Sequence, residues 1–303
     1  MKIAVVGAGA MGSLFGGLLA ESGAEVWLLD IRAEQISAIN QNGLNIEKDG
    51  HCRHVHIKAT TDPDHIEMAD LAIVFVKSPQ TRSAADIAGK LVGSEGLVLT
   101  LQNGIGNAEI IAETVARERI VAGTTSHGAT LLAPGHIRHA GTGATIIGMW
   151  DSKNLGHADR IAHIMTQAGI ETEVVQSVQN VIWNKLLINV GINAITALSG
   201  IKNGQILDLE ITRNLSQAAV EEAMSVARTQ GIQVDEDTVE HVFQVAKATG
   251  DNRSSMGQDV DNKRLTEIDA INGAVVRIAE KIGLKVPVNL ALTALVETLQ
   301  LHF

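Results

Sequence analysis

The sequence contains no tyrosine, and its aromatic residues make up only 2% of 303 residues. Without tyrosine, the chain cannot use any mechanism in which a tyrosine hydroxyl supplies the proton, which excludes the Tyr–Lys pair of the short-chain dehydrogenases. So few aromatic rings also give no platform on which the bases of a single-stranded nucleic acid could stack. The formal net charge of −10 argues against binding a phosphate backbone, so we expect no nucleic-acid partner.

Cysteine and long apolar runs are also scarce. Only one cysteine, Cys52, is present, so the chain cannot form an internal disulfide, which is typical of a reducing cytoplasm. No run of 18 apolar residues is free of polar interruption, and we therefore expect no membrane span. A strand pattern begins at Lys2 and leads directly into a glycine turn, so we expect no signal peptide.

Hydrophobic residues make up 45% of the chain, which is enough for a packed core, and the length suggests about two domains. Short apolar segments alternate with helical patterns in the first half, and this alternation predicts a mostly parallel, doubly wound sheet. Residues 130–147 are expected to add antiparallel strands. The other expected strands are residues 2–6, 25–29, 71–76, 96–101, 120–124 and 173–175, with helices at residues 11–21 and 33–41.

The pattern changes near residue 177, because helical segments then follow one another and Pro287 is the only proline that remains. We therefore expect an α/β dinucleotide-binding domain at residues 1–177 and an all-helical domain, which binds the substrate, at residues 178–303. The expected helices of the second domain are residues 178–198, 211–230, 237–249, 267–282 and 289–302.

A glycine motif follows the first expected strand, in the order Gly7-Ala8-Gly9-Ala10-Met11-Gly12. In a G-x-G-x-x-G turn, the first glycine permits the tight turn and the second lets the backbone approach a pyrophosphate. The third lets the helix and strand pack closely, while the helix N-terminus supplies free N–H groups and a positive dipole end. The strand before the motif and the helix after it favour dinucleotide binding over an ordinary glycine-rich turn.

An acid, Asp30, ends the second expected strand. A carboxylate at this position accepts hydrogen bonds from the adenosine ribose hydroxyls and repels a 2′-phosphate, so the sequence predicts NAD(H) in preference to NADP(H). Arg32 and Lys77 complicate this prediction, since either could reach a phosphate from the side. The structural alternative for Asp30 is a solvated strand end.

Three polar residues, Lys185, Asn189 and Asn193, recur at intervals of four within an otherwise apolar helical pattern. Each step of four rotates only about 40° around a helix, so the three share one face. A lysine and two amides inside such a helix would be partly buried and would need polar partners. Spacing alone favours a structural alternative, in which the lysine extends to solvent and the asparagines bond to neighbouring helices.

Further polar segments lie at residues 251–259 and 265–273, and the first contains Asn252 and Ser255. Thr266 is placed to cap the helix expected from Glu267, with Asp269 in its first turn. Composition alone is in keeping with capping and a solvated loop, so these segments carry no functional prediction by themselves.

Taken together and in order, these motifs resemble the ketopantoate reductases (2-dehydropantoate 2-reductases) over essentially the whole chain. That family has a Rossmann domain followed by an all-α domain, with the active site in the cleft between them, which agrees with the pattern above. The residues that carry the resemblance are the glycine motif, Leu101-Gln102-Asn103-Gly104-Ile105-Gly106, the Trp-Asn-Lys-x-x-x-Asn-x-x-x-Asn helix from Trp183, residues 252–259 and Thr266-Glu267-Ile268-Asp269.

The resemblance implies a role for each matching residue. Lys185 matches the catalytic lysine, which donates a proton to the ketone oxygen, and Glu267 matches the acid that works beside it. Asn103 matches the asparagine near the nicotinamide, and we assign it to both cofactor and substrate binding. Lys77 joins residues 7–12 and Asp30 in the expected cofactor site. The residues assigned to the 2-oxo acid and its hydroxyl are Asn189, Asn193, Asn252 and Ser255.

The implied activity is hydride transfer from a nicotinamide cofactor to the C2 carbonyl of a small 2-oxo acid, with 2-dehydropantoate reduced to D-pantoate as first candidate. Negative charge develops on the carbonyl oxygen, where an ammonium group stabilises it and delivers a proton. Two alternatives stay open: an NAD-dependent D-2-hydroxyacid dehydrogenase for branched or aromatic 2-oxo acids, and a non-catalytic NAD-sensing module. The oligomeric state is open as well, a homodimer included.

Two departures from the family pattern favour the dehydrogenase alternative. Family members that use NADP usually carry an arginine just after the second strand, where this chain has Asp30 and Ile31. Gly257 stands where the family often has a larger apolar residue, and we expect the missing bulk to admit a wider substrate side chain.

Histidine is the remaining candidate for special chemistry. Cys52, His54 and His56 alternate and would share one face of a strand, but a zinc site needs three or four ligands with a supporting shell. We therefore expect no metal and interpret these residues as a polar strand face. The histidines around the glycine-rich strands are expected to be structural or to lie at the rim of a site; they are His127, His136 and His139.

Overall fold

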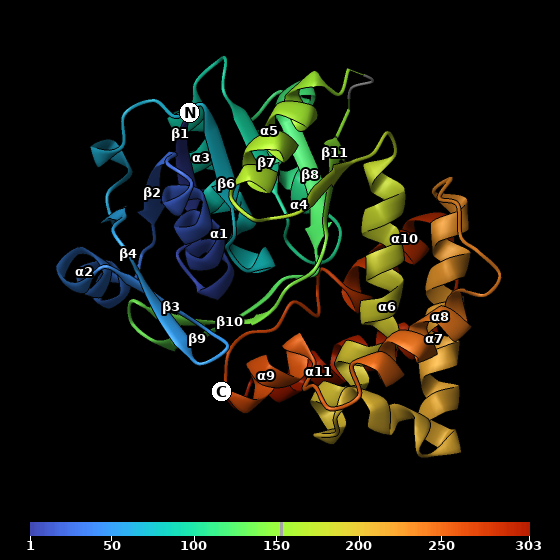
Figure 1. The fold of residues 1–303 in the computed structure, drawn as a ribbon. Coiled ribbons are helices and arrows are strands. Elements are labelled where there is room, and N and C mark those ends of the chain that lie inside the picture. The colour runs from blue at the N-terminus through green and yellow to red at the C-terminus, as the bar shows by residue number, and fades with distance from the viewer. Residues whose placement is uncertain (152–153) are drawn as a thin grey trace. The chain divides into compact units, whose positions relative to one another are not determined.

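The computed structural model describes residues 1–151 and 154–303, and these divide into two compact units (Figure 1). The first unit consists of Met1–Gln102 and Asn107–Val178. The second consists of Asn103–Gly106 and Gln179–Phe303. A short segment from the first half of the chain therefore belongs to the second unit.

The main sheet of the first unit contains eight strands within the described residues, in the order β12-β11-β8-β7-β6-β1-β2-β5. Neighbouring strands are parallel except β11 and β8, which are antiparallel. The predicted doubly wound sheet is thereby confirmed. The strands are β1 (Lys2–Val6), β2 (Glu25–Leu29), β5 (Lys58–Thr60), β6 (Leu71–Val74), β7 (Leu97–Thr100), β8 (Ile120–Thr125), β11 (Thr145–Met149) and β12 (Thr172–Val174).

The strands at the centre of this sheet are short and almost entirely apolar, because helices cover them. All residues of β6 and β7 are buried. Register places the carboxyl ends of three strands side by side, since Val6 pairs with both Leu29 and Val74. The helices of the unit are α1 (Ala10–Glu21), α2 (Ala33–Asn42), α3 (Thr81–Val92), α4 (Asn107–Ile111) and α5 (Gly156–Gln167), with single turns η1 (Pro63–His65), η2 (Ser78–Gln80) and η3 (Arg117–Arg119).

A smaller sheet of four described strands, in the order β4-β3-β10-β9, packs on α1 (Figure 1). Its strands are β3 (Leu44–Lys48), β4 (His51–Val55), β9 (Gly128–Ala133) and β10 (His136–Gly141). The antiparallel strands expected in residues 130–147 are confirmed, because β9 pairs with β10; β11 is antiparallel to β8, which lies outside that range. The parallel pairing of β10 with β3 joins segments far apart in the sequence, which the local pattern could not indicate.

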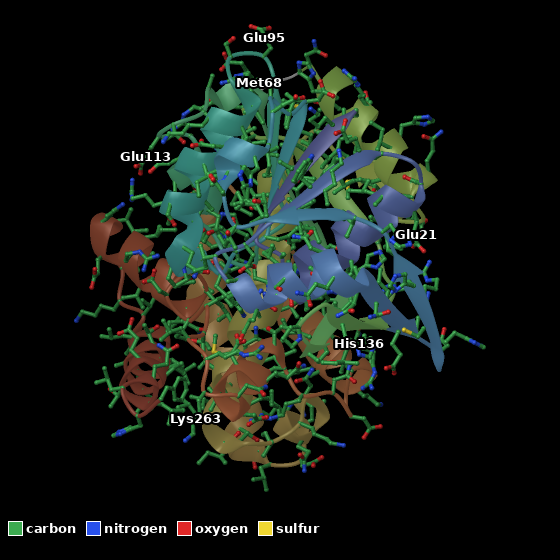
Figure 2. All side chains as sticks on the ribbon, turned by 90° about the vertical axis from the view of Figure 1, so that its left-hand side faces the viewer. Glu21, Met68, Glu95, Glu113, His136 and Lys263 are labelled. Carbon is green, nitrogen blue, oxygen red and sulfur yellow. The ribbon has the colours of Figure 1, made fainter. Side chains whose placement is uncertain are left out.

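Charged side chains lie on the outside of the first unit. Glu21, Glu95 and Glu113 are exposed, and Figure 2 shows them at its periphery. These carboxylates are part of the acid excess that gives the chain its net charge of −10.

The second unit is helical, as predicted, and is organised around the long helix α6 (Val178–Ser199). Its core includes Leu187 and Val190 of α6, which pack with Val220, Val242 and Val275 of other helices. The remaining elements are η4 (Asn203–Leu207), α7 (Glu210–Thr229), α8 (Thr238–Ala248), α9 (Ser255–Asp261), α10 (Asn272–Ile282) and α11 (Pro287–Gln300).

Two predictions on this unit were wrong. The segment 251–259, which composition indicated as capping and a solvated loop, contains most of α9, because Ser254 caps that helix by accepting a hydrogen bond from the Gly257 N–H at 3.0 Å. The helix expected from Glu267 begins only at Asn272. Thr266 does not cap that helix; its hydroxyl accepts a hydrogen bond from the Ile268 N–H and starts a tight turn.

By length and composition alone, α6 is apolar enough to cross a membrane, and it is the only such helix among the described residues. Its most apolar window has a mean hydropathy of 1.4, but 61% of that window is buried inside the protein. The helix has the burial of a core helix, which explains its composition without a lipid environment.

Candidate active site

The glycine turn connects β1 to α1. Gly7 lies at φ +103° and its N–H donates to the Leu29 carbonyl of β2 at 2.8 Å, which ties the turn to the neighbouring strand end. Gly9 is the N-cap of α1 and carries no side chain that could satisfy the first N–H groups of the helix. A helix N-terminus of this kind suits a phosphate group.

Asp30, which follows β2, is hydrogen-bonded to this turn. One carboxylate oxygen accepts a hydrogen bond from the Ala8 N–H at 2.7 Å, and the Arg32 guanidinium donates to both oxygens at 2.9 Å. Only 8% of the Asp30 side chain is exposed, so it is not a solvated strand end. Burial alone would raise the pKa of Asp30, but the hydrogen bonds and charge of Arg32 outweigh it and lower that pKa.

Neighbouring strand ends bring further residues to this edge of the sheet. Lys77 precedes η2 and follows β6, whose continuation at Phe75 donates to the Val6 carbonyl at 2.8 Å. After β7, the Gln102 side-chain amide donates to the Val76 carbonyl and to the Thr81 hydroxyl, both at 2.8 Å. Gln102 thus holds two strand ends together, a role that its place in the motif did not reveal.

The segment 103–106 belongs to the helical unit. The Ile105 N–H donates to the Ala270 carbonyl at 3.0 Å. Gly104 lies at φ +84°, and a Cβ atom there would lie 2.3 Å from the Ala270 oxygen, so any side chain would prevent this approach. The close approach places Asn103 beside Glu267, where the Asn103 Nδ2 donates to Glu267 Oε2 at 3.2 Å.

Lys185 and Glu267 are two oppositely charged residues of the helical unit that interact electrostatically. Glu267 is only 7% exposed although it is an acid, and Lys185 is half-buried on α6. Burial lowers the pKa of Lys185 to about 8, while the negative charge of Glu267 acts in the opposite direction. Strongly shifted amines beside a buried carboxylate are frequent at catalytic centres.

The other amides of the predicted face of α6 lie in different surroundings. Asn193 is 4% exposed and its Nδ2 donates to Ser255 Oγ at 3.5 Å, which joins α6 to the start of α9. Asn189, one turn closer to Lys185, is half-buried. Asn252 is exposed and lines a cavity of 870 Å³ beside Lys202 and Lys247, at the junction of η4 and α8.

The expectation that Gly257 widens a substrate pocket was wrong. The space beside Gly257 is occupied, because a Cβ atom there would lie 2.7 Å from Nη1 of Arg253. The missing bulk at this position therefore accommodates an arginine of the same segment and not a ligand.

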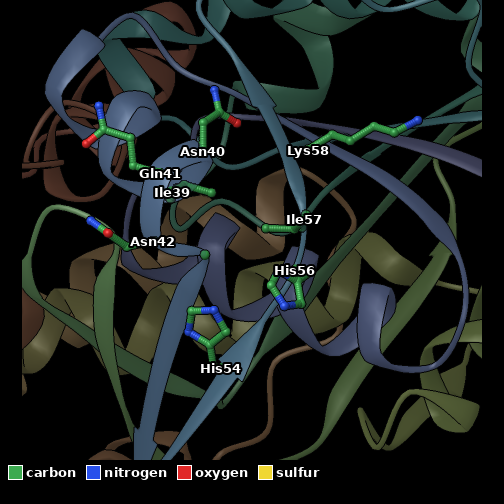
Figure 3. A pocket seen from close by; sticks show the side chains of 9 residues that line it. Ile39, Asn40, Gln41, Asn42, His54, His56, Ile57 and Lys58 are labelled. Atoms are coloured by element: carbon green, nitrogen blue, oxygen red, sulfur yellow. The ribbon is translucent and has the colours of Figure 1, made fainter.

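The alternating residues of the β3–β4 region show no metal-binding arrangement. Cys52 is exposed, and the His54 and His56 rings pack edge to face with centroids 5.0 Å apart. The two histidines line a cavity of 700 Å³ near the end of α2 (Figure 3). In the part of the chain that the structure describes, no group of three or more histidine, cysteine, aspartate or glutamate side chains could hold a metal ion.

His127 and His139 form a buried pair that sequence reasoning did not predict as a pair. Nδ1 of His127 lies 3.1 Å from Nε2 of His139, and the rings stack at 5.3 Å between centroids. Both residues are 7% exposed, and burial lowers the pKa of each imidazole. Burial therefore favours the neutral form of both rings, and His127 packs edge to face against Phe15 of α1. His136, in contrast, is half-buried beside Glu47.

A Rossmann-like unit with a glycine turn and a strand-end carboxylate, joined to a helical unit that carries a half-buried lysine near a buried glutamate, is the architecture of a nicotinamide-dependent oxidoreductase. Two family models match this chain: "Ketopantoate reductase PanE/ApbA" over residues 3–152 and "Ketopantoate reductase PanE/ApbA C terminal" over residues 177–300. The chain belongs to the ketopantoate reductase family, as its motifs predicted.

Relatives with assigned names match over the whole length. A 2-dehydropantoate 2-reductase of Halobacterium salinarum is 40% identical over 301 residues, which cover 99% of each chain. One from Pyrococcus horikoshii is 38% identical over 98% of this chain and 97% of its own.

Solved structures with the same fold include both kinds of enzyme considered above. A ketopantoate reductase of Ralstonia eutropha superposes with a TM-score of 0.92 at 32% identity, covering 99% of this chain and 98% of that one. D-mandelate dehydrogenase with NADH and anilino(oxo)acetate superposes with a TM-score of 0.93 at 30% identity and the same coverage.

Proposed function

We propose that this protein reduces the C2 carbonyl of a small 2-oxo acid with a reduced nicotinamide dinucleotide, and that its substrate is 2-dehydropantoate, converted to D-pantoate. The observation that carries the proposal is the group formed by Lys185, Glu267 and Asn103 in the helical unit. Full-length similarity to relatives named 2-dehydropantoate 2-reductase supports the choice of substrate.

The residues of the first unit fit a dinucleotide. Residues 7–10 of the turn carry no side chain larger than that of alanine, and a Cβ atom at Gly9 would meet nothing closer than the Arg32 guanidinium at 4.0 Å. A pyrophosphate can therefore approach the start of α1. When bound, the cofactor supplies the hydride that the protein itself cannot provide. The residues proposed to hold it are Gly7, Ala8, Gly9, Ala10, Met11, Gly12, Asp30, Lys77 and Asn103.

Lys185 is proposed as the general acid. Its ammonium group donates a proton to the oxygen of the C2 carbonyl as negative charge develops there. A pKa of about 8 keeps most of the amine protonated at pH 7 and leaves the proton readily transferable. Glu267 stabilises the charged amine and fixes the Asn103 carboxamide through its hydrogen bond, so one carboxylate positions two polar groups.

The substrate is proposed to bind the polar face of α6 and the segment before α9. Asn189 and Asn193 offer amide groups one and two turns beyond Lys185, and Ser255 contacts Asn193. Amides and a hydroxyl recognise the carboxylate and hydroxyl of a small acid by hydrogen bonding. Asn252, three residues before Ser255, completes the proposed set.

NADH is proposed as the preferred cofactor. The Asp30 side chain is buried at the end of β2, and its carboxylate, which has about four acceptor sites, accepts four hydrogen bonds, from the Ala8 N–H, the Arg32 N–H and two guanidinium nitrogens of Arg32. A ribose hydroxyl is therefore proposed to replace one of the two guanidinium bonds. A 2′-phosphate would meet a like charge. The Arg32 guanidinium is bound to both oxygens of Asp30 and is not directed at a phosphate, although its positive charge weakens the repulsion.

A D-2-hydroxyacid dehydrogenase for branched or aromatic 2-oxo acids is the second candidate. It is favoured by the similarity to D-mandelate dehydrogenase, whose structure contains NADH, and by Asp30. A non-catalytic NAD-binding module is disfavoured, because such a module gives no reason to bury an amine next to a carboxylate against the desolvation free energy of both.

Steady-state rates decide between the candidates. The purified protein is assayed with 2-dehydropantoate, branched 2-oxo acids and phenylglyoxylate, each with NADH and with NADPH. We expect the largest kcat/KM for 2-dehydropantoate with NADH. A larger value for phenylglyoxylate would assign the protein to the second candidate, and cofactor binding without turnover of any 2-oxo acid would contradict both.

A further inference from the structure

Arg253 links the ends of two helices in the helical unit. Its Nη1 donates to the Thr196 carbonyl in the last turn of α6 at 2.6 Å and to the Ile201 carbonyl just beyond that helix at 2.9 Å. Its Nε and Nη2 donate hydrogen bonds to the two carboxylate oxygens of Asp261 at the end of α9, at 2.8 and 2.9 Å. Such a bidentate interaction fixes the orientation of the planar guanidinium.

This guanidinium occupies the space that Gly257 leaves open. A Cβ atom at position 257 would lie 2.7 Å from Nη1 and 2.8 Å from Cζ of Arg253. Any larger residue must therefore displace the guanidinium and break its bonds to α6. Gly257 lies inside α9 with ordinary helical backbone, where glycine is intrinsically less favourable than alanine. The space for the guanidinium, and not a special backbone conformation, therefore accounts for a glycine at this position.

The link lies within the proposed substrate site. Arg253 stands between Asn252 and Ser255 in the sequence, and Ser255 contacts Asn193 on α6. The adjacent Ser254 accepts a hydrogen bond from the Thr196 hydroxyl at 2.7 Å, next to the carbonyl that Arg253 binds. The relative position of the two sets of polar groups, one on α6 and one before α9, is thus fixed at the Thr196 turn.

We propose that Arg253 is a positioning residue for 2-oxo acid binding, which holds the segment 252–255 on the end of α6, and that Gly257 provides the space this requires. The proposal rests on the proposed function for its kinetic part. Arg253 acts through Asn252, Ser255 and Asn193, so its loss should weaken binding of the 2-oxo acid more than it slows the chemical step at Lys185.

A double-mutant cycle in thermal unfolding tests the geometry without any substrate. In the wild-type background, Gly257→Ala is expected to lower Tm by about 3 °C or more, because the methyl group displaces the guanidinium. In the Arg253→Ala background, the same change is expected to lower Tm by at least about 2 °C less, because the guanidinium is absent and only the 3.1 Å approach to Ser254 Oγ opposes the better helix propensity of alanine. Arg264→Ala, at an exposed arginine nearby, is the matched control and should leave Tm unchanged.

Steady-state kinetics test the function. Arg253→Ala is expected to raise KM for the 2-oxo acid about tenfold with kcat within about threefold, while KM for the cofactor stays unchanged. Gly257→Ala should give the same pattern, and KM of the double variant for the 2-oxo acid should be no higher than that of Arg253→Ala. Arg253→Lys should recover part of the affinity for the 2-oxo acid. The lysine ammonium can donate hydrogen bonds to the Thr196 and Ile201 carbonyls but cannot bind the Asp261 carboxylate at the same time.

The outcomes separate the two proposals. If Gly257→Ala changes Tm by the same amount in both backgrounds, the proposed contact does not exist. If the two Tm changes differ but KM for the 2-oxo acid stays within twofold of wild type, or kcat and KM for the cofactor change equally, Arg253 is a structural residue only. If the wild type turns over no 2-oxo acid, the proposed function and this positioning role both fail, while the thermal cycle still decides the contact.

Discussion

The Glu267 carboxylate accepts a hydrogen bond from the Asn103 side chain at 3.2 Å, although 164 positions of sequence separate the two residues. Glu267 also supports the charge of Lys185, which comes from a third segment. A single buried carboxylate therefore acts on two polar groups of the helical unit, Asn103 and Lys185.

Replacement of Lys185 by alanine is expected to lower kcat for 2-oxo acid reduction by about 10²–10⁴-fold, the usual loss when a general acid is removed. Binding of NADH should persist, because the glycine turn and Asp30 belong to the other unit. Steady-state kinetics and a titration of NADH fluorescence measure the two effects. A variant that keeps more than about a tenth of wild-type kcat would show that Lys185 is not the proton donor.

The pH dependence of kcat for 2-oxo acid reduction should reveal the pKa of the Lys185 amine. The proton donor must be charged, so kcat is expected to fall as pH rises through the Lys185 pKa of about 8. Glu267→Gln removes the negative charge that raises this pKa, so the falling limb should move to lower pH and kcat should decrease. Profiles of kcat against pH for both proteins measure the shift; an unchanged limb would mean that Glu267 does not act on Lys185.

Cofactor preference should depend on Asp30. We expect the wild type to favour NADH over NADPH by about tenfold in kcat/KM, which corresponds to about 1.4 kcal/mol. Asp30→Ala removes the like charge and frees Arg32, so the ratio should shrink mainly through better use of NADPH. Glu34→Ala removes the same charge from an exposed position nearby and should leave the ratio unchanged. A wild type that prefers NADPH would contradict the role given to Asp30.

The buried histidine pair should make the fold sensitive to acid. Burial lowers the pKa of His127 and His139 in the folded protein, so the unfolded chain binds protons more readily than the folded one. The stability they contribute is complete above the ordinary histidine pKa of about 6.5 and is lost as pH falls below it. Urea unfolding at pH 7.5 and 5.5 measures how much the free energy of unfolding decreases on acidification. This decrease should be smaller for His139→Gln than for wild type. For His157→Gln, a change at an exposed histidine, it should equal that of wild type.

Local patterns predicted the parts of this protein that local interactions determine. The strand, glycine turn and helix of residues 2–21 follow from apolar runs and glycine spacing, and the shared face of Lys185, Asn189 and Asn193 follows from helical period. The family resemblance placed Glu267 beside Lys185, which spacing alone could not do because the two residues lie on different segments.

The errors came from contacts between distant segments. The helix expected from Glu267 begins at Asn272, because Thr266 and Ile268 form a tight turn that brings Ala270 against Gly104. The interpretation of Gly257 failed because composition shows a missing side chain but not the arginine that fills its place. The pairing of His127 with His139 likewise depends on the β9–β10 register, which no local pattern encodes.

The membership of residues 103–106 in the helical unit has a consequence during synthesis of the chain. The segment emerges from the ribosome with the first half, but Ala270 and Glu267, which hold it, follow about 164 residues later. At translation rates of about 5–20 residues per second, that delay is roughly 10–30 s. The sheet of the first unit can form within that interval, whereas Asn103 acquires its final partner only when the chain is nearly finished. Maturation of the site is therefore a late event, set by the distance along the chain and not by the speed of either unit's own folding.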